Sequence, residues 1–144
     1  MKKNEPTPAL AGTNGVMHRV YVVEDHHLMR RSLVEAIERE PDLMVCGQAE
    51  DAPEILAIVS FQPDIVLTDI QLKSTSGLDL IKALRVRLPA LPIVATTMFD
   101  VRRTERVARA AGASGFVSKH DGPDKLIAMI REVIKKGGRK DEPV

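Results

Sequence analysis

The sequence is poor in the residue types that mark several large classes of proteins. It has one cysteine, Cys46, so no disulfide can form within the chain. Tryptophan is absent and aromatic residues make up 3% of the chain, which leaves few rings on which nucleic-acid bases could stack. The formal net charge is +1, too small an excess of basic residues to drive binding to DNA or RNA. We therefore expect no direct nucleic-acid binding by this chain.

Long hydrophobic runs are also missing. No apolar stretch is long enough to span a bilayer, and the amino terminus lacks the apolar core of a signal peptide. This predicts a cytoplasmic protein without membrane contact. The chain has 144 residues, of which 44% are hydrophobic, which suits one globular domain with a single core. Cys46 lies in the apolar run 43–46, which predicts a buried, unreactive thiol.

Composition divides the chain into three parts. Residues 1–17 are rich in Pro, Gly, Thr and Asn and show no periodicity, which predicts a disordered leader. The natural start is either Met1 or Met17, which stands just before the first apolar run. Residues 18–136 form the predicted domain, and residues 137–144 a flexible tail or the start of a linker.

Strands and helices alternate five times within the predicted domain. The expected strands are 19–23, 43–46 closed by Gly47, 65–67, 92–96 and 116–118. A helix follows each strand: one with Met29, Leu33, Ala36 and Ile37 on one face, then 52–60, 78–88, 102–111 and 124–136. Asp25 is the expected cap of the first helix. This order predicts an α/β fold, a doubly wound parallel sheet with helices on both faces.

Polar side chains stand at the ends of four of the strands. Glu24 and Asp25 follow the first strand, Asp69 the third, Thr97 the fourth and Lys119 the fifth. The carboxyl ends of parallel strands lie at one edge of the sheet, where such folds place their chemistry. One strand-end aspartate is usually only a helix cap, but the joint placement of these residues predicts a shared site.

Three carboxylates in one site repel each other unless a cation neutralises them. Oxygen ligands suit Mg²⁺, and Lys119 supplies further positive charge. In such a site Asp69 is the predicted nucleophile that accepts a phosphoryl group. Lys119 and the Thr97 hydroxyl are expected to contact the phosphoryl oxygens. The pair His26-His27 is a poor transition-metal site, because adjacent side chains on a helix point in different directions.

Four segments carry a resemblance to a known family. They are VYVVEDHH, DIVLTDIQLKSTSGLDLI, PIVATTMFD and AGASGFVSKH, and together they extend from Arg19 to about Lys136. This set resembles the receiver domains of two-component response regulators. The Glu-Asp-His start and the Met after Thr97 are most similar to the NarL/FixJ (LuxR-type) branch. The resemblance implies a single (βα)5 flavodoxin-like sheet with strand order 2-1-3-4-5.

The resemblance also implies specific roles and partners. Asp69 would be the phosphoacceptor, which receives its phosphoryl group from a sensor histidine kinase. Mg²⁺ would be held by Glu24, Asp25, Asp69 and the backbone carbonyl of Gln71. Thr97 and Phe116 would be the switch residues, although Phe116 also suits an ordinary core position. Phosphorylation would then alter the face made by the fourth helix, fifth strand and fifth helix, with a phosphorylation-dependent homodimer as one outcome. Such a domain signals and is not an enzyme.

Two residues depart from the family pattern. Lys73 stands where the family usually has Pro, four residues after the phosphoacceptor, and His120 follows Lys119 where many members have Pro. Neither departure changes the chemical groups of the site. We also expect Phe99, bulky and apolar, to shield the phosphoryl group from water together with Gln71.

The output of the domain is open at this stage. One reading is transcription control through a DNA-binding domain that this chain does not contain. The alternatives are a stand-alone receiver acting in phosphorelay or by docking, and a pseudo-receiver that is never phosphorylated. A flavin carrier of the same topology would need a loop rich in Gly, Ser and Thr after the first strand, where this chain has Glu24-Asp25-His26-His27.

Overall fold

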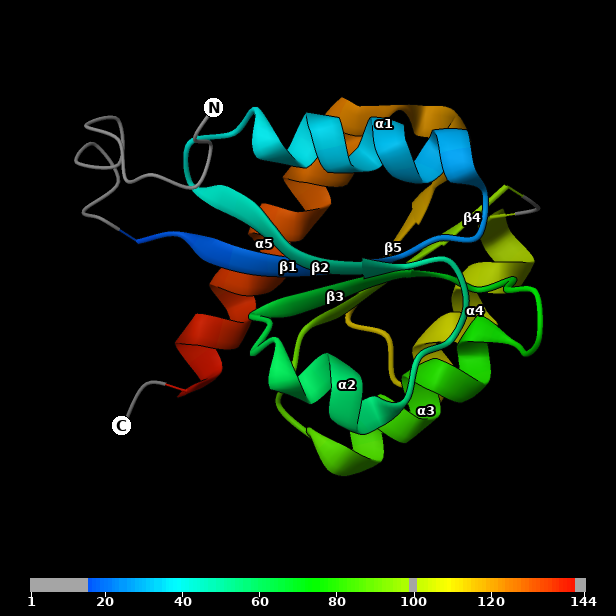
Figure 1. Cartoon of the computed structure of the whole chain (residues 1–144). Helices are drawn as coiled ribbons and strands as arrows, with labels where there is room; N and C mark the ends of the chain where they lie inside the picture. The colour runs from blue at the N-terminus through cyan, green and yellow to red at the C-terminus, as the bar shows by residue number, and fades with distance from the viewer. Residues whose placement is uncertain (1–15, 99–100, 142–144) are drawn as a thin grey trace.

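A computed structural model of the chain describes residues 16–98 and 101–141. Residues 1–15 of the predicted leader, Phe99 and residues 142–144 lie outside this part. Strands and helices alternate in the predicted order (Figure 1). They are β1 (His18–Val23), α1 (His27–Glu38), β2 (Leu43–Ala49), α2 (Ile55–Ser60), β3 (Ile65–Asp69), α3 (Gly77–Arg87), β4 (Ile93–Thr97), α4 (Val101–Ala111), β5 (Gly115–Ser118) and α5 (Pro123–Asp141).

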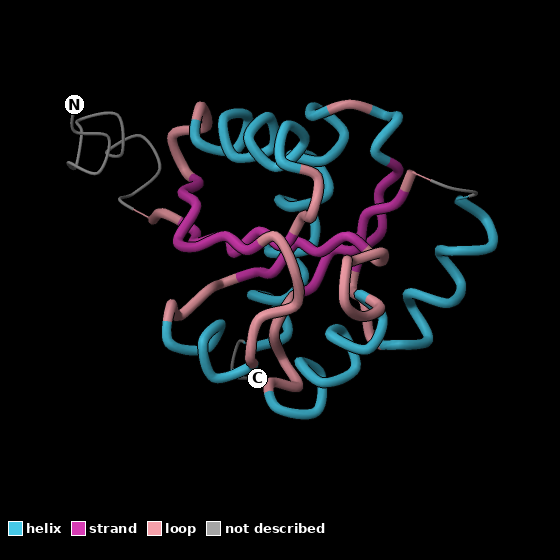
Figure 2. Tube along the Cα trace, turned by 45° about the vertical axis from the view of Figure 1, so that its right-hand side comes forward, coloured by secondary structure: helices cyan, strands magenta, loops and turns pink. Residues whose placement is uncertain are grey.

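The five strands form one parallel sheet in the order β2-β1-β3-β4-β5, as the resemblance implied. Helices cover both faces (Figure 2). Side chains of α1 and α5 pack in one apolar cluster, and those of α2, α3 and α4 in the other. Within the described residues, no helix is both long enough and apolar enough to cross a bilayer.

Strand β3 lies in the middle of the sheet and is buried along its whole length. Val66 packs in the cluster on the α2-α3-α4 side, whereas Ile65 and Leu67 pack in the cluster on the α1-α5 side. Alternate side chains therefore enter opposite cores, which explains why the run is apolar without interruption. The strand ends at Asp69, and its rigid setting fixes the position of that carboxylate.

The start of α1 and the length of β2 differ from the prediction. The Nδ1 atom of His26, not Asp25, caps α1 by accepting a hydrogen bond from the Met29 amide at 3.2 Å. Gly47 does not end β2. The register against β1 shifts there, and a Cβ at Gly47 would lie 2.6 Å from the Tyr21 ring. Glycine thus lets the strand continue beneath an aromatic side chain.

Three further details differ from the prediction. Helix α2 begins at Ile55 rather than Ala52, and the Ala52 amide instead donates to the Asp51 carboxylate at 2.9 Å. Helix α5 continues past Lys136 to Asp141. Cys46 is half-buried rather than buried, and burial raises the pKa of its thiol. The division of the chain at residues 17 and 136 stays a prediction.

Helix α4 buries small side chains in its carboxyl-terminal half. Among residues 102–111 the buried side chains are Ala108 and Ala111, two of the smallest, while Val107 is exposed. Beyond its end, Gly112 adopts φ +124°, a conformation that favours glycine. The guanidinium of Arg85 on α3 donates to the Gly112 carbonyl at 2.6 Å and 3.0 Å and to the Leu91 carbonyl at 2.7 Å. One α3 side chain therefore holds the end of α4.

Candidate functional site at the carboxyl edge of the sheet

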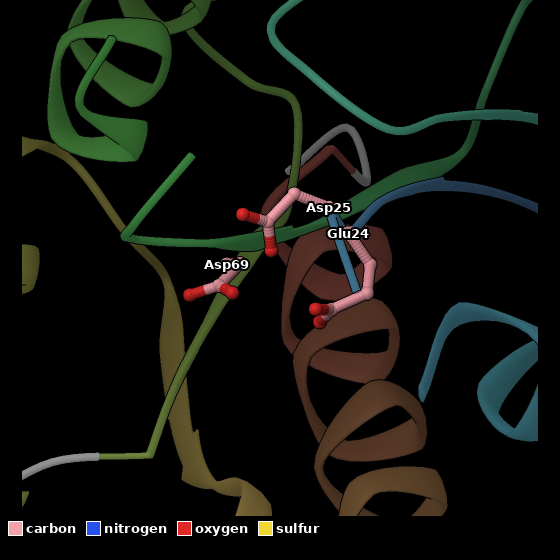
Figure 3. Close-up of side chains that lie close together, drawn as sticks. All are labelled: Glu24, Asp25 and Asp69. Atoms are coloured by element: carbon pink, nitrogen blue, oxygen red, sulfur yellow. The ribbon is translucent and has the colours of Figure 1, made fainter. Parts of the chain in front are cut away.

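Three carboxylates meet where β1 and β3 end. One carboxylate oxygen from each of Glu24, Asp25 and Asp69 lies within 4.8 Å of the other two. Figure 3 shows the three side chains turned toward a common space. Glu24 and Asp69 are 1% and 6% exposed, and Asp25 is half-buried. The predicted convergence of these distant acids is therefore present in the fold.

Lys119, the first residue after β5, reaches into this cluster. Its Nζ atom lies 2.7 Å from Oδ2 of Asp69 and 2.7 Å from Oε1 of Glu24. The hydrogen bond to Glu24 goes to the other oxygen, Oε2, at 2.9 Å. The Lys119 side chain is itself 6% exposed. A buried ammonium between two buried carboxylates is a strongly coupled arrangement, because little water screens the charges.

The protonation of these groups follows from burial and pairing. Burial raises the pKa of Glu24, and the hydrogen bond from Lys119 offsets only part of that rise. For Lys119, burial alone would lower the pKa, but hydrogen bonds to Asp69 and Glu24 outweigh it and the pKa is raised. Lys119 is therefore a fixed positive charge at neutral pH.

The donor set fits a hard divalent cation. Three carboxylates against one ammonium leave an excess of two negative charges when the acids are ionised. Oε1 of Glu24 is buried and receives no hydrogen bond from the described residues, although it lies close to Lys119. Buried polar atoms without partners are rare in folded proteins. All three acids offer oxygen, which Mg²⁺ prefers to the exclusion of softer ligands.

The predicted hydroxyl and aromatic residues lie on the neighbouring strands. Thr97 is buried at the end of β4, one residue beyond Thr96, which pairs with Asp69 in the sheet. Phe116 on β5 is buried and belongs to the same apolar cluster as Ala108 of α4. Thr97 thus stands at the edge of the site and Phe116 between the sheet and α4. Their roles as switch residues stay predictions.

The loop after Asp69 folds back onto the end of β3. The Gln71 amide donates to Oδ1 of Asp69 at 2.9 Å, and the Gly77 amide donates to the Ile70 carbonyl at 2.8 Å. Ser76 caps α3 by accepting from the Leu78 amide at 3.0 Å. Asp69 therefore uses one oxygen for this loop and the other for Lys119. The predicted part of the Gln71 carbonyl in metal binding stays a prediction.

Sequence reasoning missed two residues that shape this loop. A Cβ at Gly77 would collide with the backbone carbonyl oxygen of Asp69, so α3 begins against the site only because that residue is glycine. Asp51, from the loop after β2, accepts a hydrogen bond from the Ser74 amide at 3.2 Å. The Ser-Gly pair before an apolar helix was a usable signal for Gly77. Nothing in one sequence links positions 51 and 74.

Comparison with known proteins places these features in a family. The family model for the response regulator receiver domain matches residues 20–131. The DNA-binding transcriptional activator DevR/DosR of Mycobacterium tuberculosis is 32% identical over 118 residues, covering 81% of this chain and 54% of the relative. The nitrate/nitrite response regulator protein NarP of Escherichia coli is also 32% identical over 118 residues, with coverage of 81% and 55%.

A solved structure agrees with this assignment. The crystal structure of a LuxR-family two-component response regulator from Aurantimonas sp. matches with a TM-score of 0.79 and 30% identity, covering 83% of this chain and 86% of that one. The chain spans about half the length of the two curated relatives. Its similarity to them therefore concerns the receiver part.

Proposed function

The chain belongs to the response regulator receiver domain family, and from that premise we propose that it accepts a phosphoryl group on Asp69 from a sensor histidine kinase in the presence of Mg²⁺. One observation carries the proposal: Asp69 ends a buried central strand, pairs with Lys119 at 2.7 Å and adjoins the carboxylates of Glu24 and Asp25. The family is one of signalling domains, so the chain assists its own phosphorylation and is not an enzyme in the ordinary sense.

The chemistry follows from the charges of the site. A carboxylate oxygen of Asp69 attacks phosphorus, a P–O bond forms, and the P–N bond to the histidine of the kinase breaks. Lys119, held by Glu24, would neutralise one phosphoryl oxygen, and the Thr97 hydroxyl would donate to another. Glu24, Asp25, Asp69 and the Gln71 carbonyl would hold Mg²⁺, which neutralises the remaining negative charge when bound.

The response would pass through Thr97 and α4. Thr97 ends β4 and precedes α4, whose buried side chains among residues 102–111 are two alanines. A helix with so little buried apolar area is held weakly, so a new hydrogen bond to Thr97 can bias its packing and that of Phe116. The face formed by α4, β5 and α5 would then change its affinity for a partner or for a second copy.

Transcription control is the output that the relatives favour. DevR/DosR is described as a DNA-binding transcriptional activator, and this chain covers 54% of it. By analogy, we propose that the receiver regulates a DNA-binding domain in a longer protein. A stand-alone receiver that acts by phosphorelay or docking is the second candidate.

Phosphorylation by a small donor tests the central proposal. Incubation with acetyl phosphate and Mg²⁺ should add one phosphoryl group, read by intact-mass spectrometry, and chelation of Mg²⁺ should prevent it. Asp69→Asn should abolish the adduct while the circular dichroism spectrum is retained. Asp79→Asn, an exposed acid in the first turn of α3, is the matched control and should be labelled normally.

Three outcomes would count against the proposal. A folded wild-type protein that is never labelled would be a pseudo-receiver. Labelling of Asp69→Asn to the wild-type extent would place the acceptor elsewhere. A purified protein that carries bound flavin would favour the flavin-carrier alternative.

A further inference from the structure

The β3–α3 loop is held firmly at its two ends. At the first end, the Gln71 amide donates to the Asp69 carboxylate. At the second, the Gly77 amide donates to the Ile70 carbonyl, and Gln71 and Ser76 form an isolated bridge. These bonds close the base of the loop next to the acid cluster. They do not include residues 72–75, here called the arch, of which Leu72 packs against the α2-α3-α4 cluster while Lys73 and Ser74 are exposed.

Asp51 restrains the arch from outside. Its Oδ1 atom accepts a hydrogen bond from the Ser74 amide at 3.2 Å and another from the Ala52 amide at 2.9 Å. Through Ser74, Asp51 ties the arch to the loop after β2. In Figure 1 the loops after β2 and β3 lie at the same end of the sheet. The bond therefore joins two loops that border the site.

Asp51 is suited to this task. Hydrogen bonds from Ser74 and Ala52 lower the pKa of its carboxyl group. The carboxylate is consequently ionised at neutral pH, and an ionised oxygen accepts a stronger hydrogen bond than a neutral one. The Ala52 bond also fixes the orientation of the Asp51 side chain. The acceptor oxygen of Asp51 is thus oriented independently of the β3–α3 loop.

The local sequence explains why an external restraint is needed. The arch contains Leu72, Lys73, Ser74 and Thr75, none of which limits its own backbone as proline does. Lys73 is exposed and occupies the position where the resemblance leads one to expect Pro. Leu72 packs against the α2-α3-α4 cluster, but the exposed residues Lys73 and Ser74 have no such packing. Motion of these two residues would strain the bonds that hold Gln71 at the base of the loop.

We propose that Asp51 is a positioning residue for the phosphoryl site: by holding Ser74 it keeps the β3–α3 loop, and with it Gln71, in the orientation that Mg²⁺ binding requires. This inference rests on the proposed function, since it concerns the same site. Asp51 itself touches neither the cation nor the reacting atoms. Its effect should therefore resemble that of residues that orient metal ligands without contacting the metal.

The test compares Asp51→Ala, Asp51→Asn and the double variant Asp51→Ala/Lys73→Pro with the wild type. Mg²⁺ affinity is measured by calorimetric titration of Mg²⁺ alone, and phosphorylation by acetyl phosphate is measured across Mg²⁺ concentrations. For Asp51→Ala we expect Mg²⁺ affinity to fall about tenfold, with the phosphorylation rate at saturating Mg²⁺ changing much less. Asp51→Asn retains an acceptor oxygen, so its Mg²⁺ affinity should fall less than that of Asp51→Ala.

The double variant Asp51→Ala/Lys73→Pro tests whether restraint of the loop is the cause of the effect. Proline at position 73 restricts the arch from within, so it should restore most of the Mg²⁺ affinity that Asp51→Ala loses. Lys73→Pro alone should change affinity little, because the wild-type loop is already restrained. Asp79→Ala, which removes an exposed carboxylate on α3, controls for the loss of negative charge and should bind Mg²⁺ normally.

Several results would overturn the proposal. One is an unchanged Mg²⁺ affinity in Asp51→Ala. Another is an equal loss of Mg²⁺ affinity in Asp51→Asn and Asp51→Ala, which would indicate an effect of charge alone. A third is a double variant that folds but does not regain Mg²⁺ affinity. Failure of the proposed function is distinguishable, because a protein that binds Mg²⁺ but is never phosphorylated still reports on Asp51 through the calorimetric titration.

Discussion

The Nζ atom of Lys119 lies 2.7 Å from Oδ2 of Asp69, although the two residues are 50 positions apart in the sequence. The pair joins the carboxyl ends of β5 and β3, with β4 between them in the sheet. Because both side chains are almost fully buried, each depends on the other for its charge balance. Three predictions follow from this and from two other contacts.

Replacement of Lys119 by methionine should destabilise the protein. The change leaves the carboxylates of Glu24 and Asp69 buried without their cation, a loss of roughly 3 kcal/mol in the free energy of unfolding. Added Mg²⁺ should recover part of it by neutralising the same acids. Urea denaturation with and without Mg²⁺ measures both effects. Lys82→Met, an exposed position on α3, is the control, and equal stability of the two variants would contradict the prediction.

Gly77→Ala should impair both stability and phosphorylation. The added methyl group collides with the backbone of Asp69 and Ile70, which cannot move without displacing the Asp69 carboxylate. We expect a loss of about 1–3 kcal/mol, larger than the gain of up to about 1 kcal/mol from improved helix propensity. Gly137→Ala, in α5, meets only the Pro92 ring at 3.2 Å and serves as the control. Thermal unfolding and the acetyl phosphate assay would test this; a Gly77→Ala protein as stable and as reactive as wild type would refute it.

Arg131→Ala should reduce stability in a pH-dependent way. Arg131 on α5 donates to Oδ1 of Asp42 and to Oε1 of Glu40, each at 2.7 Å, and the hydrogen bond from Arg131 lowers the pKa of Asp42. A lowered folded-state pKa stabilises the fold above the ordinary Asp pKa, about 3.9, and the contribution disappears as pH falls through the lower value. We expect a difference from wild type of about 0.5–1 kcal/mol at neutral pH.

Chemical denaturation of both proteins near neutral pH and in acid measures this difference. It should shrink as the pH is lowered, whereas a constant difference would show that the pair is not the cause. Arg39→Ala removes an exposed arginine at the end of α1 and should have little effect on stability at either pH.

The fold was largely predictable because the apolar pattern is unambiguous where burial is complete. Ile65, Val66 and Leu67 are apolar without a break since they enter both cores, and that run located β3 and therefore Asp69. The convergence of Glu24, Asp25 and Lys119 on Asp69 then followed from the rule that parallel strands share an edge. Topology brought these residues together, so no pairwise information was needed.

Prediction failed where a local contact overrode a general preference. Asp25 is a favourable cap in general, yet here His26 caps α1, and Asp25 joins the acid cluster. Gly47 normally indicates a turn, but the Tyr21 ring requires it inside a strand. The Asp51–Ser74 hydrogen bond links two loops with no periodicity. Such contacts depend on the three-dimensional arrangement of backbone that one sequence does not specify.

The guanidinium of Arg85 anchors the carboxyl end of α4. It donates to the Gly112 carbonyl just beyond α4, and Ala108 and Ala111, the buried side chains among residues 102–111, lie in the carboxyl-terminal half of the helix. A displacement of α4 that keeps these contacts would be a tilt about Gly112, with the largest movement at the end nearest Thr97. A small shift of Thr97 beside the acid cluster would thus produce a larger displacement of the exposed surface of α4.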